Sequence, residues 1–222
     1  MSAPSHYFES LAGAPVHYDR LTAADYGGAG VPRKFYCDPA LQAQLESLFG
    51  EIFGRAPSAF GGPKVILSAG TYVNKPGQHG LGKAFDLDGI HWQDRTFIAK
   101  RQRRDKALYL AIQALCHKYF GIVLGYNYNR LHKDHLHIDL GRPVKFRETK
   151  STTYFLQEAL NTFFDQAVTV DGEFGSATAA AIADARSMID VGPVSRPDNW
   201  TAFLDHVAEE GFGAAGQQAT TG

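Results

Sequence analysis

The chain has few cysteines, no excess of basic charge and no long apolar run, and each absence argues against one class of protein. Its 222 residues include only two cysteines, Cys37 and Cys116, whose spacing fits neither a zinc ribbon nor a CxxC redox motif. The 22 basic and 23 acidic residues give a formal net charge of −1, so the overall charge predicts no nucleic-acid partner. No segment approaches the roughly 20 consecutive apolar residues of a membrane-spanning helix, so we expect no membrane span.

Two further features bear on the compartment. The N-terminal residues, MSAPSHYFESLAGAPVHYDR, contain no basic n-region and no continuous apolar h-region, so they do not predict a Sec signal peptide. Cys116 lies in an apolar stretch with helical periodicity, ALYLAIQALCHKYF, where a free cysteine behaves as a small buried hydrophobe. Alternatively, Cys37 and Cys116 form a disulfide, which requires an oxidising compartment. The sequence leaves both interpretations of the cysteines open.

Hydrophobic periodicity predicts an α+β fold with a small, mostly antiparallel sheet flanked by helices. Residues 1–35 are glycine-rich in part and weakly periodic, and we expect mostly loop there. Helical spacing predicts helices over residues 39–53 and 103–120, the first capped by Asp38 ahead of Pro39. Short apolar runs predict four strands, over residues 64–68, 84–88, 121–125 and 134 or 135 to 140.

The character of the sequence changes near residues 147–152, where we place a domain boundary. Three helical patterns follow, over residues 154–164, 176–188 and 200–210. They predict a small three-helix domain over residues 151–212, after a first domain over residues 1–148. The last residues, 213–222, read GAAGQQATTG, and they predict a disordered tail.

Histidines and carboxylates gather in two short segments, of which the second reads HKDHLHIDL over residues 132–140. As a strand, this segment turns successive side chains to opposite faces, so His135, His137 and Asp139 share one polar face. The leucine and isoleucine residues between them form the other face, which packs on the core. The two imidazoles are about 7 Å apart along the strand, so one can bind a metal ion while the other reaches the metal-bound water.

The first segment, HGLGKAFD, carries His79 on a glycine-rich loop that leads into a strand with Asp86. Glycine at positions 80 and 82 lets the loop turn back, so that His79 and Asp86 converge. Together the segments supply two histidines and one carboxylate, which suits a catalytic zinc ion with three protein ligands and an open position for water. Asp134, just before the second strand, is the candidate to take the proton of that water.

These segments resemble the motifs of the LAS metallopeptidases, which include lysostaphin-type peptidases, D-Ala-D-Ala carboxypeptidases and the hedgehog fold. HGLGKAFD is similar to the HxxGxAxD motif, and HKDHLHIDL resembles the second motif of the carboxypeptidase branch. The stretch SAGTYVNKPGQHGLGKAFDLD also looks like the bacterial extensin-like C-terminal domain. The resemblance covers roughly residues 35–142 and implies a LAS/hedgehog-like fold.

The resemblance implies a role for each polar residue of the two motifs. It implies one zinc ion per chain, bound by His79, Asp86 and His137. Asp134 then corresponds to the general base. His135 is implied to stabilise the oxyanion or to position water, and His132 matches a position near the site in some carboxypeptidases.

The sequence departs from this family just before the first ligand. Relatives often carry an arginine there, in an SGYR-like stretch that binds the substrate carboxylate or steadies the transition state. Here the stretch reads SAGTYVNKPGQ. Lys75 and Tyr72 are the candidate substrate contacts in its place, although lysine lacks the bidentate fork of arginine. The departure bears on carboxypeptidase specificity more than on hydrolysis.

The C-terminal region resembles the three-helix peptidoglycan-binding module. That family shows LQxxLN followed by VDGxFGxxTxxA, and this chain reads LQEALN from Leu156 and VDGEFGSATAAA from Val170. The resemblance implies peptidoglycan as the partner. The residues after Arg186 read SMIDVGP and depart from the pattern of that family.

Both resemblances point to one polymer, so we expect zinc-dependent hydrolysis of peptide bonds in peptidoglycan stem peptides or cross-links, by a D,D-carboxypeptidase or an endopeptidase. The alternative is a non-catalytic, zinc-stabilised cell-wall-binding protein in which His135 is a fourth ligand. A third hypothesis is a hydrolase of another wall polymer, since extensin-like domains have no settled substrate.

The site of action that follows is the periplasm or the cell wall. Without a visible Sec signal peptide, release requires a holin, as for a phage lysin, or a specialised secretion machine, as for an antibacterial effector with an immunity protein. A signal segment missing from the given sequence is the third possibility.

Overall fold

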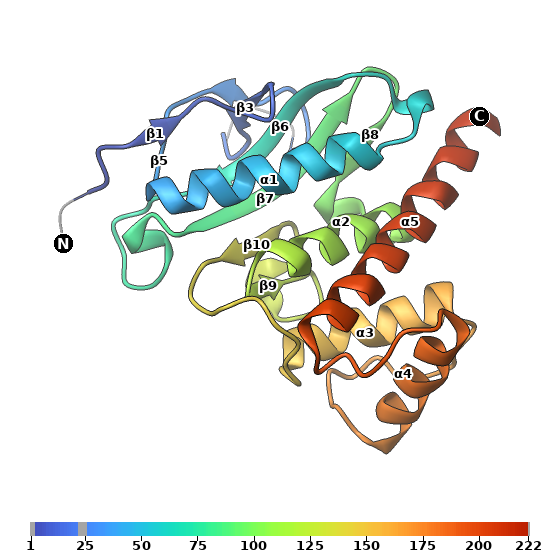
Figure 1. The fold of residues 1–222 in the computed structure, drawn as a ribbon. Coiled ribbons are helices and arrows are strands. Elements are labelled where there is room, and N and C mark those ends of the chain that lie inside the picture. The colour runs from blue at the N-terminus through green and yellow to red at the C-terminus, as the bar shows by residue number, and fades with distance from the viewer. Residues whose placement is uncertain (1–2, 22–25, 222) are drawn as a thin grey trace.

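The structure, a computed structural model, describes residues 3–21 and 26–221 and has the α+β architecture that the periodicity predicts. Figure 1 shows the helices and the sheet. The α-helices are α1 (Pro39–Arg55), α2 (Lys106–Tyr119), α3 (Lys150–Phe163), α4 (Ser176–Met188) and α5 (Pro197–Thr221). Short 3₁₀ helices are η1 (Ser58–Phe60), η2 (His79–Leu81), η3 (Ala99–Arg101) and η4 (Arg130–His132).

The main sheet has the strand order β2-β3-β6-β7-β10-β9, with β4 beside β3 and β8 beside β7. Its strands are β2 (Ser10–Leu11), β3 (Ala14–Tyr18), β4 (Val31–Pro32), β6 (Pro63–Gly70), β7 (Ala84–Trp92), β8 (Thr96–Ile98), β9 (Ile122–Leu124) and β10 (Leu136–Asp139). All pairs in it are antiparallel except β3 with β6. A separate antiparallel pair joins β1 (Tyr7–Phe8) to β5 (Phe35–Tyr36). The expected mostly antiparallel sheet is therefore confirmed.

Most described residues between 3 and 35 lie outside regular elements, as expected, but the region also contributes β1 to β4 and the start of β5, which the sequence did not predict. Most of these strands are two residues long, too short to show an alternating pattern. They form because β3 gains a parallel partner in β6 and because the side chains of Phe8, Leu11 and Val16 are buried. Positions 1–2 and 22–25 of the predicted loop lie outside the described residues.

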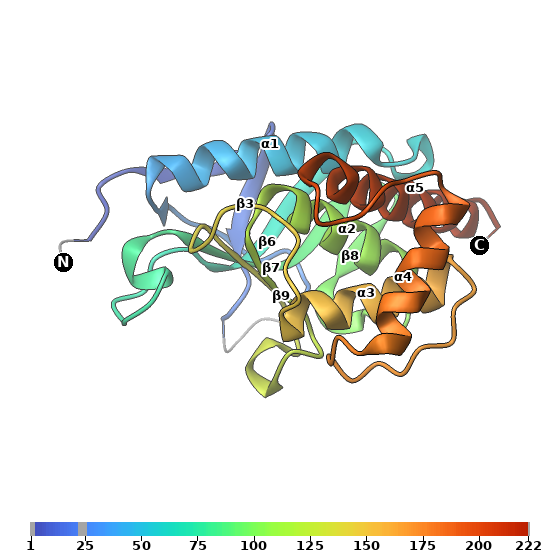
Figure 2. The same ribbon diagram turned by 60° about the horizontal axis from the view of Figure 1, so that its bottom comes forward.

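Helices α1 and α2 lie over the same face of the main sheet (Figures 1 and 2). Asp38 caps α1 as predicted, because its Oδ1 accepts a hydrogen bond of 2.9 Å from the Ala40 amide. The Phe49 ring of α1 packs edge-on against Phe85 of β7, with 5.9 Å between ring centroids. This face is the apolar core, so the polar side chains of β7 and β10 are left on the opposite face.

The C-terminal helix α5 packs along α2 (Figure 1). A Cβ atom on Gly211 would lie 2.4 Å from the carbonyl oxygen of Ala107, so glycine permits this close approach of the two helices. The tail predicted to be disordered is helical as far as Thr221, because the packing buries Phe212 and Ala215 although the sequence around them is small and polar. Its last residue, Gly222, lies outside the described part.

Buried side chains of the C-terminal helices join the same hydrophobic core as those of α1 and α2. The division into two independently folding domains stays a prediction, and the structure shows continuous packing between the two segments. None of the helices in the described part of the chain combines the length and the apolar character that crossing a membrane requires.

The two cysteines are free and buried, so the structure favours the thiol interpretation over a disulfide. Burial raises the pKa of the Cys37 thiol to about 11. Cys116 lies in the core of α2, where burial also raises its pKa. Both side chains therefore act as small core hydrophobes.

One buried side chain, Gln157 of α3, organises the loop between α3 and α4. Its Oε1 accepts hydrogen bonds from the amides of Asp171 and Gly172, at 3.0 and 2.9 Å. Its Nε2 donates to Asp171 Oδ1 at 2.8 Å and to Thr178 Oγ1 at 3.1 Å. These are conspicuous residues of the LQxxLN and VDGxFGxxTxxA patterns, so their first role here is to hold the turn against the helices.

We predict that Gln157→Ala lowers the free energy of unfolding by about 2–4 kcal/mol, because the two loop amides lose their acceptor inside the protein. Urea denaturation measures this loss. Thr162→Ala, an exposed change on the same helix, should cost less than about 0.5 kcal/mol. Equal stabilities for the two variants would contradict the structural role of Gln157.

Candidate metal centre

The candidate site lies on the polar face of the sheet, where β7 and β10 are neighbours. Asp86 of β7 and His137 of β10 are directly opposite each other in the antiparallel register. Directly opposite residues point to the same face and have Cβ atoms about 5 Å apart. Phe85 and Ile138, one position along, point into the core. The alternation predicted for both strands is therefore confirmed, and strand pairing alone brings two candidate ligands together.

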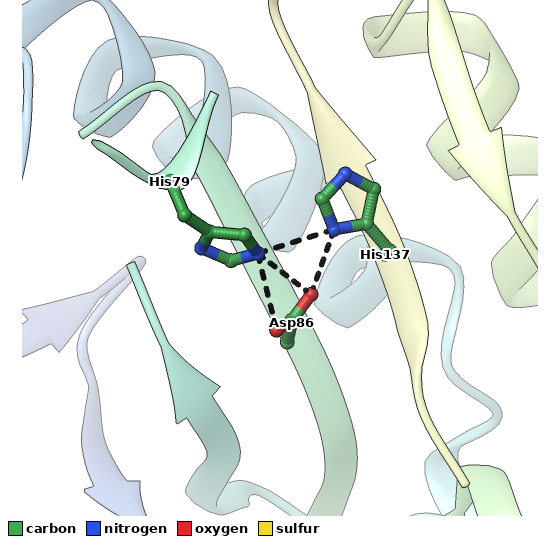
Figure 3. A group of neighbouring side chains, drawn as sticks. All are labelled: His79, Asp86 and His137. Atoms are coloured by element: carbon green, nitrogen blue, oxygen red, sulfur yellow. Dashed lines mark hydrogen bonds and ion pairs between the residues drawn. The ribbon is translucent and has the colours of Figure 1, made fainter. Parts of the chain in front are cut away.

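His79, the third candidate ligand, begins η2 in the loop before β7. The loop folds so tightly at Gly80 that a Cβ atom there would lie 1.8 Å from the carbonyl oxygen of Lys75. Only glycine fits this position. Gly82 has a φ of 65°, and its amide donates to the carbonyl oxygen of His79 at 3.0 Å. Glycine at both positions lets the chain return to the sheet, and the imidazole of His79 then lies over Asp86 (Figure 3).

The three side chains present donor atoms within 4.8 Å of one another. His79 Nε2 lies 3.3 Å from His137 Nδ1 and 3.2 Å from Asp86 Oδ2. His137 Nδ1 lies 2.9 Å from Asp86 Oδ1. Ligand atoms about 2.1 Å from a tetrahedral zinc ion lie roughly 3.4 Å apart. The spacing of the three donors therefore fits one such ion.

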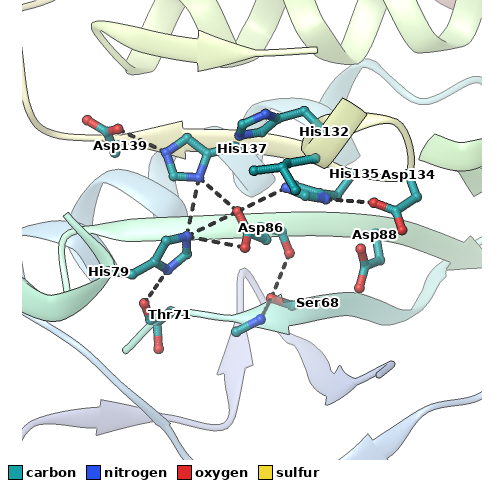
Figure 4. Close-up of polar contacts among 12 residues, drawn as sticks. Ser68, Thr71, His79, Asp86, Asp88, His132, Asp134, His135, His137 and Asp139 are labelled. Carbon is teal, nitrogen blue, oxygen red and sulfur yellow. Dashed lines mark hydrogen bonds and ion pairs between the residues drawn. The ribbon is translucent and has the colours of Figure 1, made fainter. Parts of the chain in front are cut away.

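Two further hydrogen bonds fix which ring nitrogen of each histidine faces the centre (Figure 4). His79 Nδ1–H donates to the carbonyl oxygen of Thr71 at 2.6 Å, and His137 Nε2–H donates to Asp139 Oδ2 at 2.9 Å. The opposite nitrogens then face each other and Asp86, an arrangement that a shared proton or a metal ion between them stabilises. Partners of this kind orient metal-binding histidines in proteins.

Electrostatics agree with a site for a positive charge. Burial alone would lower the pKa of His137, but its hydrogen bonds to Asp139 and Asp86 raise it to about 9. Burial would raise the pKa of Asp86, but hydrogen bonds from His137 and His79 hold it well below its usual range. Asp86 is therefore ionised, and a metal ion would replace the proton shared among these groups.

The donor atoms face a cavity of about 400 Å³. Its walls are Lys75, Pro76, Gly77, Gln78, His79, Asp86, Leu131, His132, His135 and His137. Of the two substrate contacts predicted from the sequence, Lys75 lines this cavity, whereas Tyr72 lines a separate hollow near Arg33 and Tyr36. The loop carries the two side chains to different surfaces, and between them the Val73 amide donates to the carbonyl oxygen of His79 at 3.3 Å.

Asp134 and His135 form a pair beside the three donors (Figure 4). His135 Nδ1–H donates to Asp134 Oδ1 at 2.9 Å, and His135 Nε2 lies 3.6 Å from Asp86 Oδ1. His135 therefore separates the Asp134 carboxylate from the donors and lines the cavity, whereas Asp134 does not. Burial would raise the pKa of Asp134, but hydrogen bonds from Arg20 and His135 lower it to about 2.

Arg20 contacts the candidate site although the sequence analysis did not single it out. Its Nη1 donates to Asp134 Oδ2 at 2.7 Å, and its Nε and Nη2 donate to the two oxygens of Asp88 at 3.0 and 2.5 Å. Tyr26 donates to the carbonyl oxygen of Asp134 from the same N-terminal region. Arg20 thus reaches the candidate site from a segment far away in the sequence, where no local motif marks it.

Asp88 is the buried anchor of this arginine. Its side chain has no exposed surface, and burial raises its pKa to about 7 while Arg20 opposes the shift. Asp88 follows Asp86 by two positions on β7, so it points to the same face. Arg20 therefore links the strand that carries one candidate ligand to the segment that carries Asp134.

His132 lies at the edge of the cavity. Its ring centroid is 5.2 Å from that of His135 and 5.6 Å from that of His137. Its Nδ1–H donates to Asn129 Oδ1 at 2.8 Å. Burial and the two neighbouring histidines lower its pKa to about 4, so His132 is neutral at pH 7. The structure thus brings all three sequence-predicted histidines of the second motif to one site.

Comparison with known proteins gives one finding of similarity. Residues 68–149 match the family model described as the extensin-like protein C-terminus. The match includes every candidate ligand and supports the extensin-like part of the resemblance. No curated protein and no solved structure matches the chain. The relation of the chain to LAS metallopeptidases therefore stays a prediction. The same holds for its relation to the peptidoglycan-binding module.

We predict that the chain binds one zinc ion and that His79→Ala, Asp86→Ala or His137→Ala abolishes the binding, because each change removes one of three donors. Asp139→Asn should weaken binding about 10- to 100-fold through the orientation of His137. Calorimetry and metal analysis measure both effects. His6→Ala, an exposed histidine outside the site, is the control, and an equal loss in this variant would contradict the assignment.

We predict that Arg20→Gln lowers the free energy of unfolding by about 3 kcal/mol, because it leaves the buried Asp88 without its partner. Adding Asp88→Asn to that variant should restore part of the loss, since a neutral amide does not depend on the guanidinium. Urea denaturation of the two single variants and the double variant measures the coupling. Strictly additive losses would show that Arg20 and Asp88 do not act as a pair.

Proposed function

We propose that this protein is a zinc-dependent peptidase that hydrolyses peptide bonds in peptidoglycan stem peptides or cross-links. The observation that carries the proposal is the convergence of His79, Asp86 and His137 on one open cavity, with an Asp134–His135 pair beside it. A zinc ion held by these three residues would polarise the scissile carbonyl and activate water. The match of residues 68–149 to the extensin-like family supports the choice of this part of the chain as the active region.

The Asp134–His135 pair supplies the general base in this proposal. Asp134 holds the Nδ1 proton of His135, so the lone pair of Nε2 faces the cavity and accepts the proton of the attacking water. A carboxylate with a pKa of about 2 is a weak proton acceptor by itself, but it stabilises the imidazolium that forms. Arg20 keeps Asp134 ionised and in place, so Arg20 is a positioning residue.

Lys75 is the proposed substrate contact. It lines the same cavity as His135, and a lysine ammonium attracts a substrate carboxylate as a point charge. Arg20 does not take this role, because its guanidinium is bound to Asp88 and Asp134. Tyr72 faces another hollow, so we do not include it among the substrate contacts.

Peptidoglycan is the proposed substrate because the C-terminal residues resemble a module that binds it. The action of the enzyme would then lie in the periplasm or the cell wall. A phage lysin released by a holin and an exported effector with an immunity protein both fit this proposal.

A non-catalytic, zinc-stabilised wall-binding protein is the second candidate. One distance supports it, because it places a possible fourth ligand near the three donors. His135 Nε2 lies 3.6 Å from Asp86 Oδ1, near enough for a small side-chain rotation to make it a fourth ligand. A closed site with four protein ligands is typical of structural zinc.

We predict that the zinc-loaded protein releases muropeptides from purified sacculi and that a chelator stops the release. Mass spectrometry of the products would show loss of a terminal D-Ala for a carboxypeptidase or cleaved dimers for an endopeptidase. His135→Ala and Asp134→Asn should each lower the rate about 10²- to 10⁴-fold, the usual contribution of a general base.

The two variants also separate the candidate mechanisms. An inactive Asp134→Asn beside a fully active His135→Ala would assign the base to Asp134 directly. A wild-type protein that binds zinc but releases nothing, and whose zinc affinity falls in His135→Ala, would replace the peptidase by the zinc-stabilised binding protein. His6→Ala again serves as the histidine control.

A further inference from the structure

A second hollow, of about 870 Å³, lies next to the candidate metal centre. It is lined by Tyr26, Lys100, Arg101, Gln102, Arg103, Arg104, Tyr126, Asn127 and Lys133. Five of these side chains are cationic and none is acidic. The chain as a whole carries a net charge of −1, so this hollow concentrates positive charge that the composition does not reveal.

Acidic residues close to the hollow in the sequence are already paired with other cations. Asp105 binds Arg95 at 2.5 Å, and Asp134 binds Arg20 at 2.7 Å. Within the described residues, the side chains of Arg101, Arg103, Arg104 and Lys133 make no ion pair, and all four are exposed. The positive charge of the hollow is therefore not neutralised by the protein itself.

We propose that this hollow binds an anionic segment of a polymer, one with repeated carboxylate or phosphate groups. Arginine forks bind both groups in a bidentate manner, and clefts lined by one sign of charge raise the local concentration of opposite charge. The volume suits a ligand with several groups, because pockets of 300–1,000 Å³ hold molecules of drug size. Five cations lining one hollow match several anionic groups better than one small ion.

The position of Lys133 connects this hollow to the metal centre. Lys133 lines the hollow, whereas its neighbour His132 and nearby His135 line the cavity of about 400 Å³ beside the candidate ligands. A polymer chain that occupies the hollow thus lies next to the proposed catalytic groups. The link to hydrolysis rests on the proposed function, but binding of the anion does not.

The test is calorimetric titration of the full chain with hexa-L-glutamate, with a glycerol-phosphate hexamer and with uncharged hexa-L-glutamine. We expect at least one of the two anions to bind, more weakly at high salt, and hexa-L-glutamine not to bind. The anion that binds more tightly identifies carboxylate or phosphate as the preferred group. Binding that persists in His79→Ala would show that the site is independent of the metal centre, so its outcome is separate from that of the peptidase test.

The decisive variant is Arg104→Gln/Lys133→Gln, which removes one cation from each of the two basic segments that line the hollow. It should weaken binding of the anion at least tenfold. Lys145→Gln/Arg196→Gln removes the same two residue types from exposed positions outside the hollow and should change the affinity less than twofold. Thermal unfolding checks that both variants fold. Equal losses in the two double variants, no loss in the first, or no binding of either anion would overturn the proposal.

Discussion

The antiparallel pairing of β7 with β10 is the constraint on which the candidate site depends. It sets Asp86 opposite His137, and the alternation of side chains sends their neighbours Phe85 and Ile138 into the core on the other face. A shift of one residue in the register would bury the polar side chains and expose the apolar ones. The same packing that stabilises the sheet therefore holds two donor atoms 2.9 Å apart.

A shell of hydrogen bonds then turns this pairing into an oriented site. Thr71 and Asp139 accept the outer ring protons of His79 and His137, so the inner ring nitrogens converge on Asp86. The Asp134–His135 pair borders the same cavity and is tied by Arg20 to the sheet. Each polar group has a partner that fixes its direction, which is the preorganisation that a binding or catalytic site requires.

The two hollows beside the 131–135 segment differ in chemistry. One is lined by histidines and the candidate ligand Asp86, and the other by arginines and lysines. This division suits a ligand that presents a reactive bond at one end and anionic groups at the other. The C-terminal helix α5 packs along α2 and shares the hydrophobic core with the sheet.

The sequence by itself determined the fold class, the main helices and the residues of the candidate centre. Period-two alternation around Asp86 and His137 is a local property that survives in the structure, and so is the glycine-rich loop that carries His79. Only the tertiary structure placed Arg20 beside Asp134, 114 residues further along the chain. It also ordered the short N-terminal strands and the tail of α5, because their stability comes from partners that no local pattern reveals.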